Sequence, residues 1–78
     1  MMSADPISEG RSVSFLLNGE GHEVPVGTSV AALLERLGLP ADRVAVELNR
    51  EIVRQPFREA ATIDPGALVE IVEFVGGG

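Results

Sequence analysis

A short amphipathic segment at residues 28–38 limits the folds open to this chain more than any other feature. Its apolar side chains recur at the spacing of one helical face: Val30, Leu33, Leu34 and Leu37. Thr28 or Ser29 can cap the first turn, and Gly38 stands where a left-handed residue commonly ends a helix. Because one short helix covers only one face of a sheet, the rest of the core must come from strands.

Two segments before the helix predict a β-hairpin. Residues 12–18 and 22–26 both alternate, and the side chains expected to face inward are Val13, Phe15, Leu17, Val24 and Val26. Residues 18–21, with the sequence Asn-Gly-Glu-Gly, tolerate positive φ and favour a tight turn. Pro25 has no N–H to donate to a ladder, which predicts that the second strand lies at a sheet edge.

Three more strands are predicted after the helix, at residues 43–49, 52–54 and 68–74. An irregular loop with a short helical turn precedes the last strand and ends in the Asp-Pro-Gly turn at residues 64–66. The side chains expected to face inward or to anchor that loop are Val44, Val46, Leu48, Phe57 and Ile63.

The resulting order, β-β-α-β-β-β, describes an α+β domain. The last strand is apolar on both faces, as central strands tend to be, so we place it beside the first strand. A right-handed crossover through the helix then joins the hairpin to the third strand. We therefore predict a ubiquitin-like β-grasp, a mixed sheet with one helix packed on one face. It is expected to span residues 11–75, between a flexible leader at residues 1–10 and a flexible glycine tail at residues 76–78.

Composition excludes several kinds of site. The 78 residues carry a net charge of −6 and contain no cysteine, which excludes disulfides, iron–sulfur clusters and thiolate zinc sites. An acidic domain without a basic stripe is a poor candidate for nucleic-acid binding. The only histidine, His22, is expected to be a solvent-exposed strand residue, since nothing nearby would orient it as a base. No segment resembles a transmembrane helix or a signal peptide, which predicts a cytoplasmic protein.

The chain ends in three glycines, Gly76, Gly77 and Gly78, directly after a predicted strand. These residues lack Cβ atoms and reach about 10 Å when extended, so they could enter a channel too narrow for other residues. Lysine and cysteine are absent, which makes the terminal carboxylate the leading candidate for covalent chemistry. The alternative is a frayed end without a role.

The outer face of the last strand predicts a partner-binding surface. If Val69 and Ile71 face the helix, alternation turns the side chains between and after them to the opposite face. An exposed apolar patch, which Leu16 of the first strand could join, is then expected beside the tail, with acidic side chains that could orient a basic partner. The alternative is that a loop or the leader covers this patch. The residues predicted to bind partners are Leu16, Glu70, Val72, Glu73 and Phe74.

Three stretches, residues 28–37, 44–49 and 69–78, resemble the ThiS family, the sulfur carrier proteins of thiamine (thiazole) biosynthesis. The resemblance is most specific where the sequence Val-Glu-Ile-Val-Glu-Phe runs into Val-Gly-Gly-Gly. Two departures from the family pattern are Ala67, where aspartate is common, and the leader before the first strand.

This resemblance implies a protein co-substrate rather than an enzyme. A ubiquitin-activating-like adenylyltransferase would use ATP and Mg²⁺ to convert Gly78 to an acyl-adenylate, while the chain itself would bind no cofactor or metal. A cysteine desulfurase or a rhodanese-like protein would supply sulfur, leaving a thiocarboxylate that thiazole synthase accepts. Gly76 and Gly77 would form the threading tail.

Two other functions stay open at this point. A diglycine end is shared by several sulfur carriers, so the chain could serve molybdopterin or amino-acid biosynthesis instead. It could also be a non-covalent β-grasp adaptor that binds through its sheet. An enzyme is the weakest interpretation, because the sequence shows no catalytic constellation.

Overall fold

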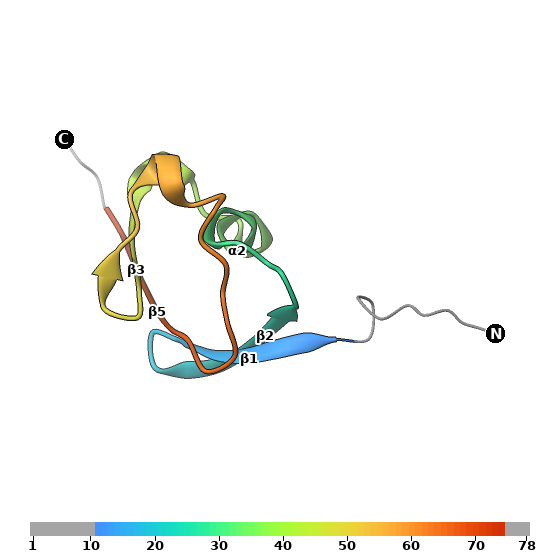
Figure 1. Ribbon diagram of the computed structural model, residues 1–78. Helices are drawn as coiled ribbons and strands as arrows, with labels where there is room; N and C mark the ends of the chain where they lie inside the picture. The colour runs from blue at the N-terminus through green and yellow to red at the C-terminus, as the bar shows by residue number, and fades with distance from the viewer. Residues whose placement is uncertain (1–10, 75–78) are drawn as a thin grey trace.

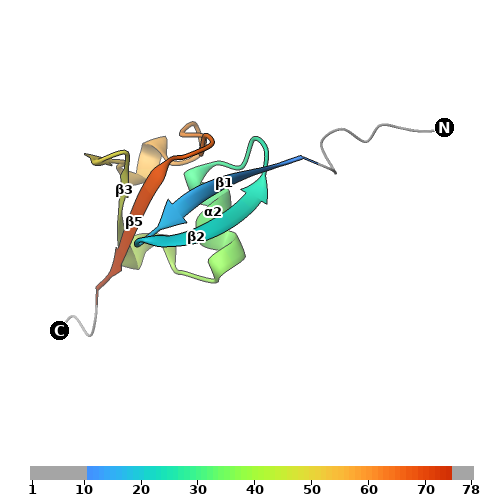
Figure 2. The ribbon, with the colours of Figure 1, turned by 90° about the horizontal axis from the view of Figure 1, so that it is seen from below.

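The computed structural model describes residues 11–74, which form a five-stranded sheet curled around one α-helix (Figures 1 and 2). The strands are β1 (Ser12–Leu17), β2 (Glu20–Pro25), β3 (Val44–Leu48), β4 (Glu51–Ile52) and β5 (Leu68–Glu73), and the helix is α2 (Val30–Leu37). Two short 3₁₀ turns, η1 (Ala41–Arg43) and η2 (Gln55–Phe57), lie in the connections. The predicted leader and glycine tail fall outside the described residues.

Strand β5 occupies the centre of the sheet. The strand order is β2-β1-β5-β3-β4, with β5 parallel to β1 and antiparallel to β3. This order confirms the predicted mixed sheet and the predicted position of the last strand beside the first. It also confirms that β2, which contains Pro25, lies at an edge.

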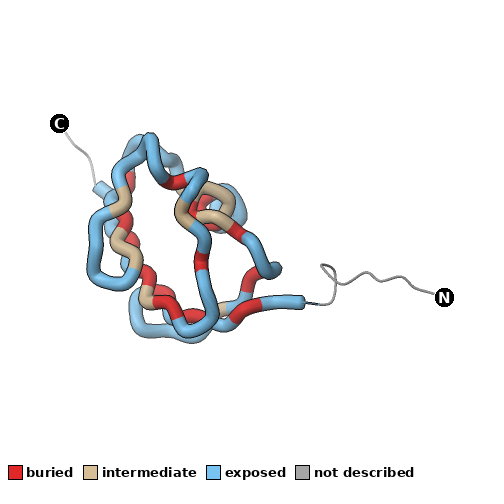
Figure 3. Tube along the Cα trace, viewed as in Figure 1, coloured by how far each residue is buried: buried red, intermediate tan, exposed pale blue. Residues whose placement is uncertain are grey.

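The core lies between the sheet and α2, and buried positions alternate with exposed ones along the strands (Figure 3). Its buried residues are Val13, Phe15, Leu17, Val24, Val30, Leu33, Leu34, Val44, Val46, Ile63, Ala67, Val69 and Ile71. Most of the side chains predicted to face inward belong to this cluster. Within residues 11–74, no helix is long and apolar enough to cross a membrane.

The helix begins and ends at the predicted residues. The Ser29 hydroxyl oxygen accepts a hydrogen bond from the Ala32 N–H at 3.0 Å, which caps the first turn. At the other end Gly38 has a φ of 73°, and the N–H groups of Gly38 and Leu39 donate to carbonyls of the last turn. Leu37, at the last helical position, is exposed, so the prediction that it belongs to the core is wrong.

Two predictions for β2 are also wrong. Val26 is exposed, because β2 ends at Pro25 and Gly27, with a φ of 90°, turns the chain toward the helix. His22 is only partly exposed, because the register pairs it with Phe15 and places both on the inner face of the sheet. The centroids of their rings are 6.0 Å apart.

A buried arginine organises the loop between β4 and β5. Phe57 is 63% exposed and does not anchor this loop as predicted, whereas Ile63 is buried as predicted. The anchor is the next residue, Arg58, which is only 6% exposed. Its guanidinium donates to three backbone carbonyls, those of Ala41 at 2.8 Å, Val44 at 3.0 Å and Val53 at 3.1 Å. These bonds satisfy a buried cation that would otherwise be costly.

Candidate partner interface along strand β5

Strand β5 is fixed in the sheet by its inner face. Val69 and Ile71 point toward α2 and are buried, as predicted. The described part of the chain ends at Phe74, whose N–H donates to the Arg43 carbonyl at 2.8 Å. The predicted sulfur-carrying residue, Gly78, and the predicted threading residues before it lie outside the described residues. The structure therefore describes β5 and Phe74, which precede these residues in the sequence.

The outer face of β5 exposes the apolar side chains that the alternation predicts. Val72 is 61% exposed and Phe74 is 55% exposed, and both follow the buried Ile71. Exposed apolar groups that lie close together on a small domain commonly mark an interface. Their exposure is confirmed, and their role in partner binding stays a prediction. We call Val72 and Phe74 the tail-side patch.

Leu16 is exposed as well, but it does not join this patch. The register pairs it with Leu68 at the start of β5, four residues before Val72. At about 3.3 Å per residue, that separation is about 13 Å along the strand. Leu16 and Leu68 therefore form a second apolar area, which we call the start-side patch, and the prediction of one continuous patch is corrected to two.

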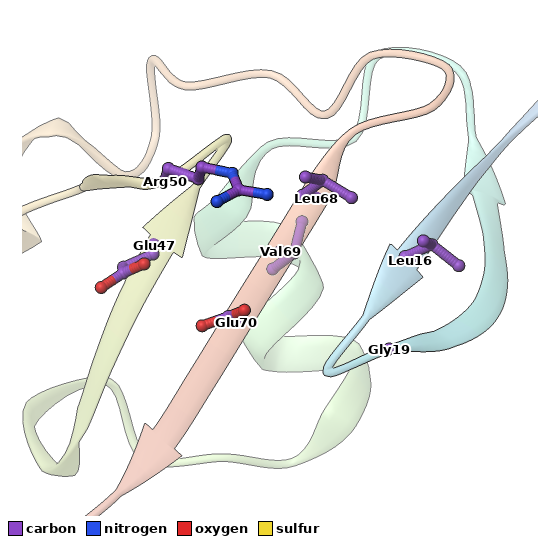
Figure 4. A pocket seen from close by; sticks show the side chains of 7 residues that line it. All are labelled: Leu16, Gly19, Glu47, Arg50, Leu68, Val69 and Glu70. Carbon is purple, nitrogen blue, oxygen red and sulfur yellow. The ribbon is translucent and has the colours of Figure 1, made fainter.

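Acidic side chains lie between the two patches. Glu70 of β5 is directly opposite Glu47 of β3 in the register. Figure 4 shows these two side chains beside a depression of about 450 Å³, whose lining also includes Leu16, Leu68 and Arg50. Like charges at directly opposite positions of a sheet are destabilising, so this pair favours a basic partner over an acidic one.

Glu73 does not belong to the same surface as Glu70. It pairs with Val44 at the end of β5, and alternation places it on the inner face of the sheet. Its side chain is nevertheless exposed, because the strand runs past the core at this point. The two carboxylates predicted to flank the patch therefore lie on opposite faces of the sheet. Of these two carboxylates, Glu70 is the one on the outer face.

A third exposed apolar area lies away from β5 and was not predicted. Ile52 and Phe57 are both more than half exposed. They line a depression of about 520 Å³ together with residues of β4 and of the loop that follows it. This area arises because Arg58, rather than Phe57, takes the buried position in the loop.

Sequence reasoning also missed two asparagines that hold β5 on its two sides. The Asn18 side chain accepts the Ile71 N–H at 2.9 Å and donates to the Ile71 carbonyl at 3.2 Å. The Asn49 side chain accepts the Leu68 N–H at 3.0 Å. Each residue was predicted only as the end of a strand and the start of a turn. The available signal was that each one directly follows a strand expected to be near β5.

The described residues contain no arrangement suited to catalysis by a metal. Residues 11–74 bring together no group of three histidine or acidic side chains that could hold a metal ion. The described arrangement consists of a central paired strand with an exposed outer face.

Comparison with known proteins identifies relatives of this arrangement. The model of the ThiS family matches residues 15–78. A thiazole synthase from Magnetococcus marinus is 39% identical over 62 residues, which are 80% of this chain but only 19% of that protein. This chain thus spans about one fifth of the length of that relative.

Two solved structures share the fold. The crystal structure of the thiamine biosynthesis protein ThiS from Geobacter metallireducens is 33% identical, with a TM-score of 0.73, and the match covers 85% of this chain and 100% of that chain. A protein designed on the template of human ubiquitin matches with a TM-score of 0.51 at 18% identity, covering 86% of this chain and 95% of that chain. The second match concerns the fold alone and confirms that it is ubiquitin-like.

Proposed function

This chain belongs to the ThiS family, and from that premise we propose that it carries sulfur on the carboxyl group of Gly78 and delivers it to thiazole synthase. The observation that carries the proposal is the family match, which extends through residue 78 and so includes the three terminal glycines. The structure supports it, because β5, the last strand before these residues in the sequence, lies at the centre of the sheet.

The proposed chemistry follows from the nature of a carboxylate. A carboxylate is a poor acyl donor, because its leaving group would be oxide. Attack of a Gly78 carboxylate oxygen on the α-phosphate of ATP, with release of pyrophosphate, would convert that oxide into the far better leaving group AMP. Hydrosulfide would then displace AMP and lose a proton, leaving the thiocarboxylate. A donor that holds its sulfur as a persulfide would displace AMP to give an acyl disulfide, which a thiol would have to reduce to the thiocarboxylate. ATP and Mg²⁺ belong to the adenylyltransferase in this scheme.

The partners are proposed from the relatives and from the exposed surface. The thiazole synthase relative contains a segment similar to this chain, which supports thiazole synthase as the sulfur acceptor. An adenylyltransferase of the ubiquitin-activating type and a cysteine desulfurase or rhodanese-like donor complete the scheme in the cytoplasm. We propose that the tail-side patch contacts these partners, since Phe74 is only two residues before the first of the terminal glycines.

The non-covalent adaptor is the second candidate function. The observation that favours it is the exposure of Val72 and Phe74, which would bind a partner equally well without chemistry at Gly78. Carriers for other pathways differ from the first proposal only in the acceptor of the sulfur.

Intact mass spectrometry separates the carrier from the adaptor. The protein is incubated with the adenylyltransferase of its own organism, ATP, Mg²⁺ and sodium sulfide. The expected result is a mass increase equal to the replacement of one oxygen by sulfur. A variant lacking Gly78 is the control, and it should keep the melting temperature of the full chain but gain no mass. An unchanged mass for the full chain, with an enzyme shown to be active on another carrier, would leave the adaptor as the better account.

A further inference from the structure

Asn18 connects the first hairpin to the last strand by three hydrogen bonds. It follows β1 directly and has a φ of 51°, and with Gly19 at 85° it forms the tight turn to β2. Its backbone N–H donates to the Val69 carbonyl at 2.8 Å. Its side-chain amide makes the two bonds to the Ile71 backbone, as acceptor at 2.9 Å and as donor at 3.2 Å.

The side chain of Asn18 replaces a strand residue that β1 lacks. The backbone pairing of β1 with β5 covers only Leu16 with Leu68 and Leu17 with Val69. Figure 4 shows β5 continuing well past the turn at Gly19, where β1 has already ended. The amide satisfies the N–H and the carbonyl of Ile71 in the way that the next pair of ladder bonds would. It thereby extends the support of β5 on this side to Ile71.

Beyond Ile71, the described contacts of β5 come from the other side. Val72 pairs with Ala45, Glu73 pairs with Val44, and Phe74 donates to Arg43, all in or next to β3. Asn18 is thus the last support on the β1 side of the strand before the C-terminal residues, as far as residues 11–74 describe it.

We propose that Asn18 is a positioning residue for the chemistry at Gly78, because its two side-chain bonds to Ile71 hold the β1 side of β5 close to the end of the strand. This inference rests on the proposed carrier function. Delivery of a carboxylate to an enzyme's active site is faster when the segment before it starts from a fixed point, because less freedom is lost in reaching the reactive geometry. Asn18 makes no contact with the reacting atoms and acts through Ile71.

Asn49 supplies a matched control. It has a φ of 52°, follows β3 as Asn18 follows β1, and also binds the β5 backbone through its side chain. Its contact, however, is to Leu68 at the start of the strand, away from the C-terminal end. Glycine adopts positive φ without strain, so Asn18→Gly and Asn49→Gly both remove a side-chain bridge without forcing a backbone change.

The test measures steady-state ATP–pyrophosphate exchange by the adenylyltransferase of the same organism with wild-type protein, Asn18→Gly and Asn49→Gly. The temperature is kept well below the melting midpoints of all three, so that each is folded. We expect Asn18→Gly to lower kcat by about tenfold, with KM changed by less than about twofold, because docking is retained and alignment is lost. Asn49→Gly should leave both constants within about twofold of the wild type. Amide exchange at Ile71 should accelerate only in Asn18→Gly.

Three results would overturn the proposal. An unchanged kcat for Asn18→Gly, despite faster exchange at Ile71, would show that the bridge does not position the C-terminal residues. An equal fall of kcat in both variants would show a general effect of loosening β5. If the wild-type protein itself supports no exchange, the carrier function fails and the positioning role fails with it. Normal exchange by both the wild type and Asn18→Gly removes only the positioning role.

Discussion

The two ends of β5 differ in what surrounds them, and the difference explains how one small strand can serve both stability and function. At its start, Leu68 and Val69 are paired with β1 and lie next to the Asn49 bridge, so both sides of the backbone are held. At its end, Val72 and Phe74 have support from β3 and expose most of their side chains. The start of β5 is therefore held on both sides in the sheet, whereas its end exposes side chains that a partner could contact.

The largest expected difference between the two ends of β5 concerns stability. The same substitution, valine to alanine, can be made at each end to measure it. Val69→Ala should lower the free energy of unfolding by about 2 kcal/mol, because Val69 is only 1% exposed and its removal leaves a cavity. Val72→Ala should change it by less than about 0.5 kcal/mol, since that side chain is 61% exposed. Urea denaturation measures both. Equal losses would mean that the end of β5 is as much part of the core as its start.

A second comparison sets the tail-side patch against the exposed apolar area formed by Ile52 and Phe57. Phe74→Asp should weaken binding to the adenylyltransferase by about tenfold or more while leaving the melting temperature nearly unchanged. Phe57→Asp is the matched control, because Phe57 is 63% exposed but lies near β4 rather than at the end of β5. Titration calorimetry gives the two affinities. If Phe57→Asp weakens binding and Phe74→Asp does not, the partner contacts the area of Ile52 and Phe57 rather than the tail-side patch.

The smallest expected effect concerns the acidic pair between the two patches. Glu47→Gln and Glu70→Gln should each raise the free energy of unfolding by about 0.3 kcal/mol, because each removes the same repulsion across the sheet. The double variant should therefore gain little more than either single variant. Thermal unfolding at low salt, where exposed charges interact most strongly, measures these differences. Additive gains, or a loss in either single variant, would show that the two carboxylates do not oppose each other.

The parts of the fold that follow from local patterns could be predicted, and the parts that depend on distant partners could not. The stripe of α2, the Ser29 cap, the Gly38 stop and the central position of β5 each follow from the sequence around them. Arg58 could not be predicted as a buried anchor, because two of the three carbonyls that it binds lie 17 and 14 positions away in the sequence. A charged residue next to a phenylalanine gives the opposite expectation on hydrophobicity alone.

The candidate site shows the same limit. Alternation along β5 was enough to predict that Val72 and Phe74 are exposed. It could not show that Leu16 lies beside the start of β5 rather than its end, because that requires the parallel register of β1 with β5. Alternation did not predict the bridge from Asn18 to Ile71 either, since it joins residues 53 positions apart.

Transfer of labelled sulfur tests the central claim most directly, that this domain presents Gly78 in order to deliver sulfur to thiazole synthase. The carrier is charged with radioactive sulfide by the adenylyltransferase, purified, and mixed with thiazole synthase and its other substrates. The account predicts that the label leaves the carrier and appears in the thiazole product, and that it stays on the carrier when thiazole synthase is omitted. Label that stays on the carrier in the presence of active thiazole synthase would contradict the account.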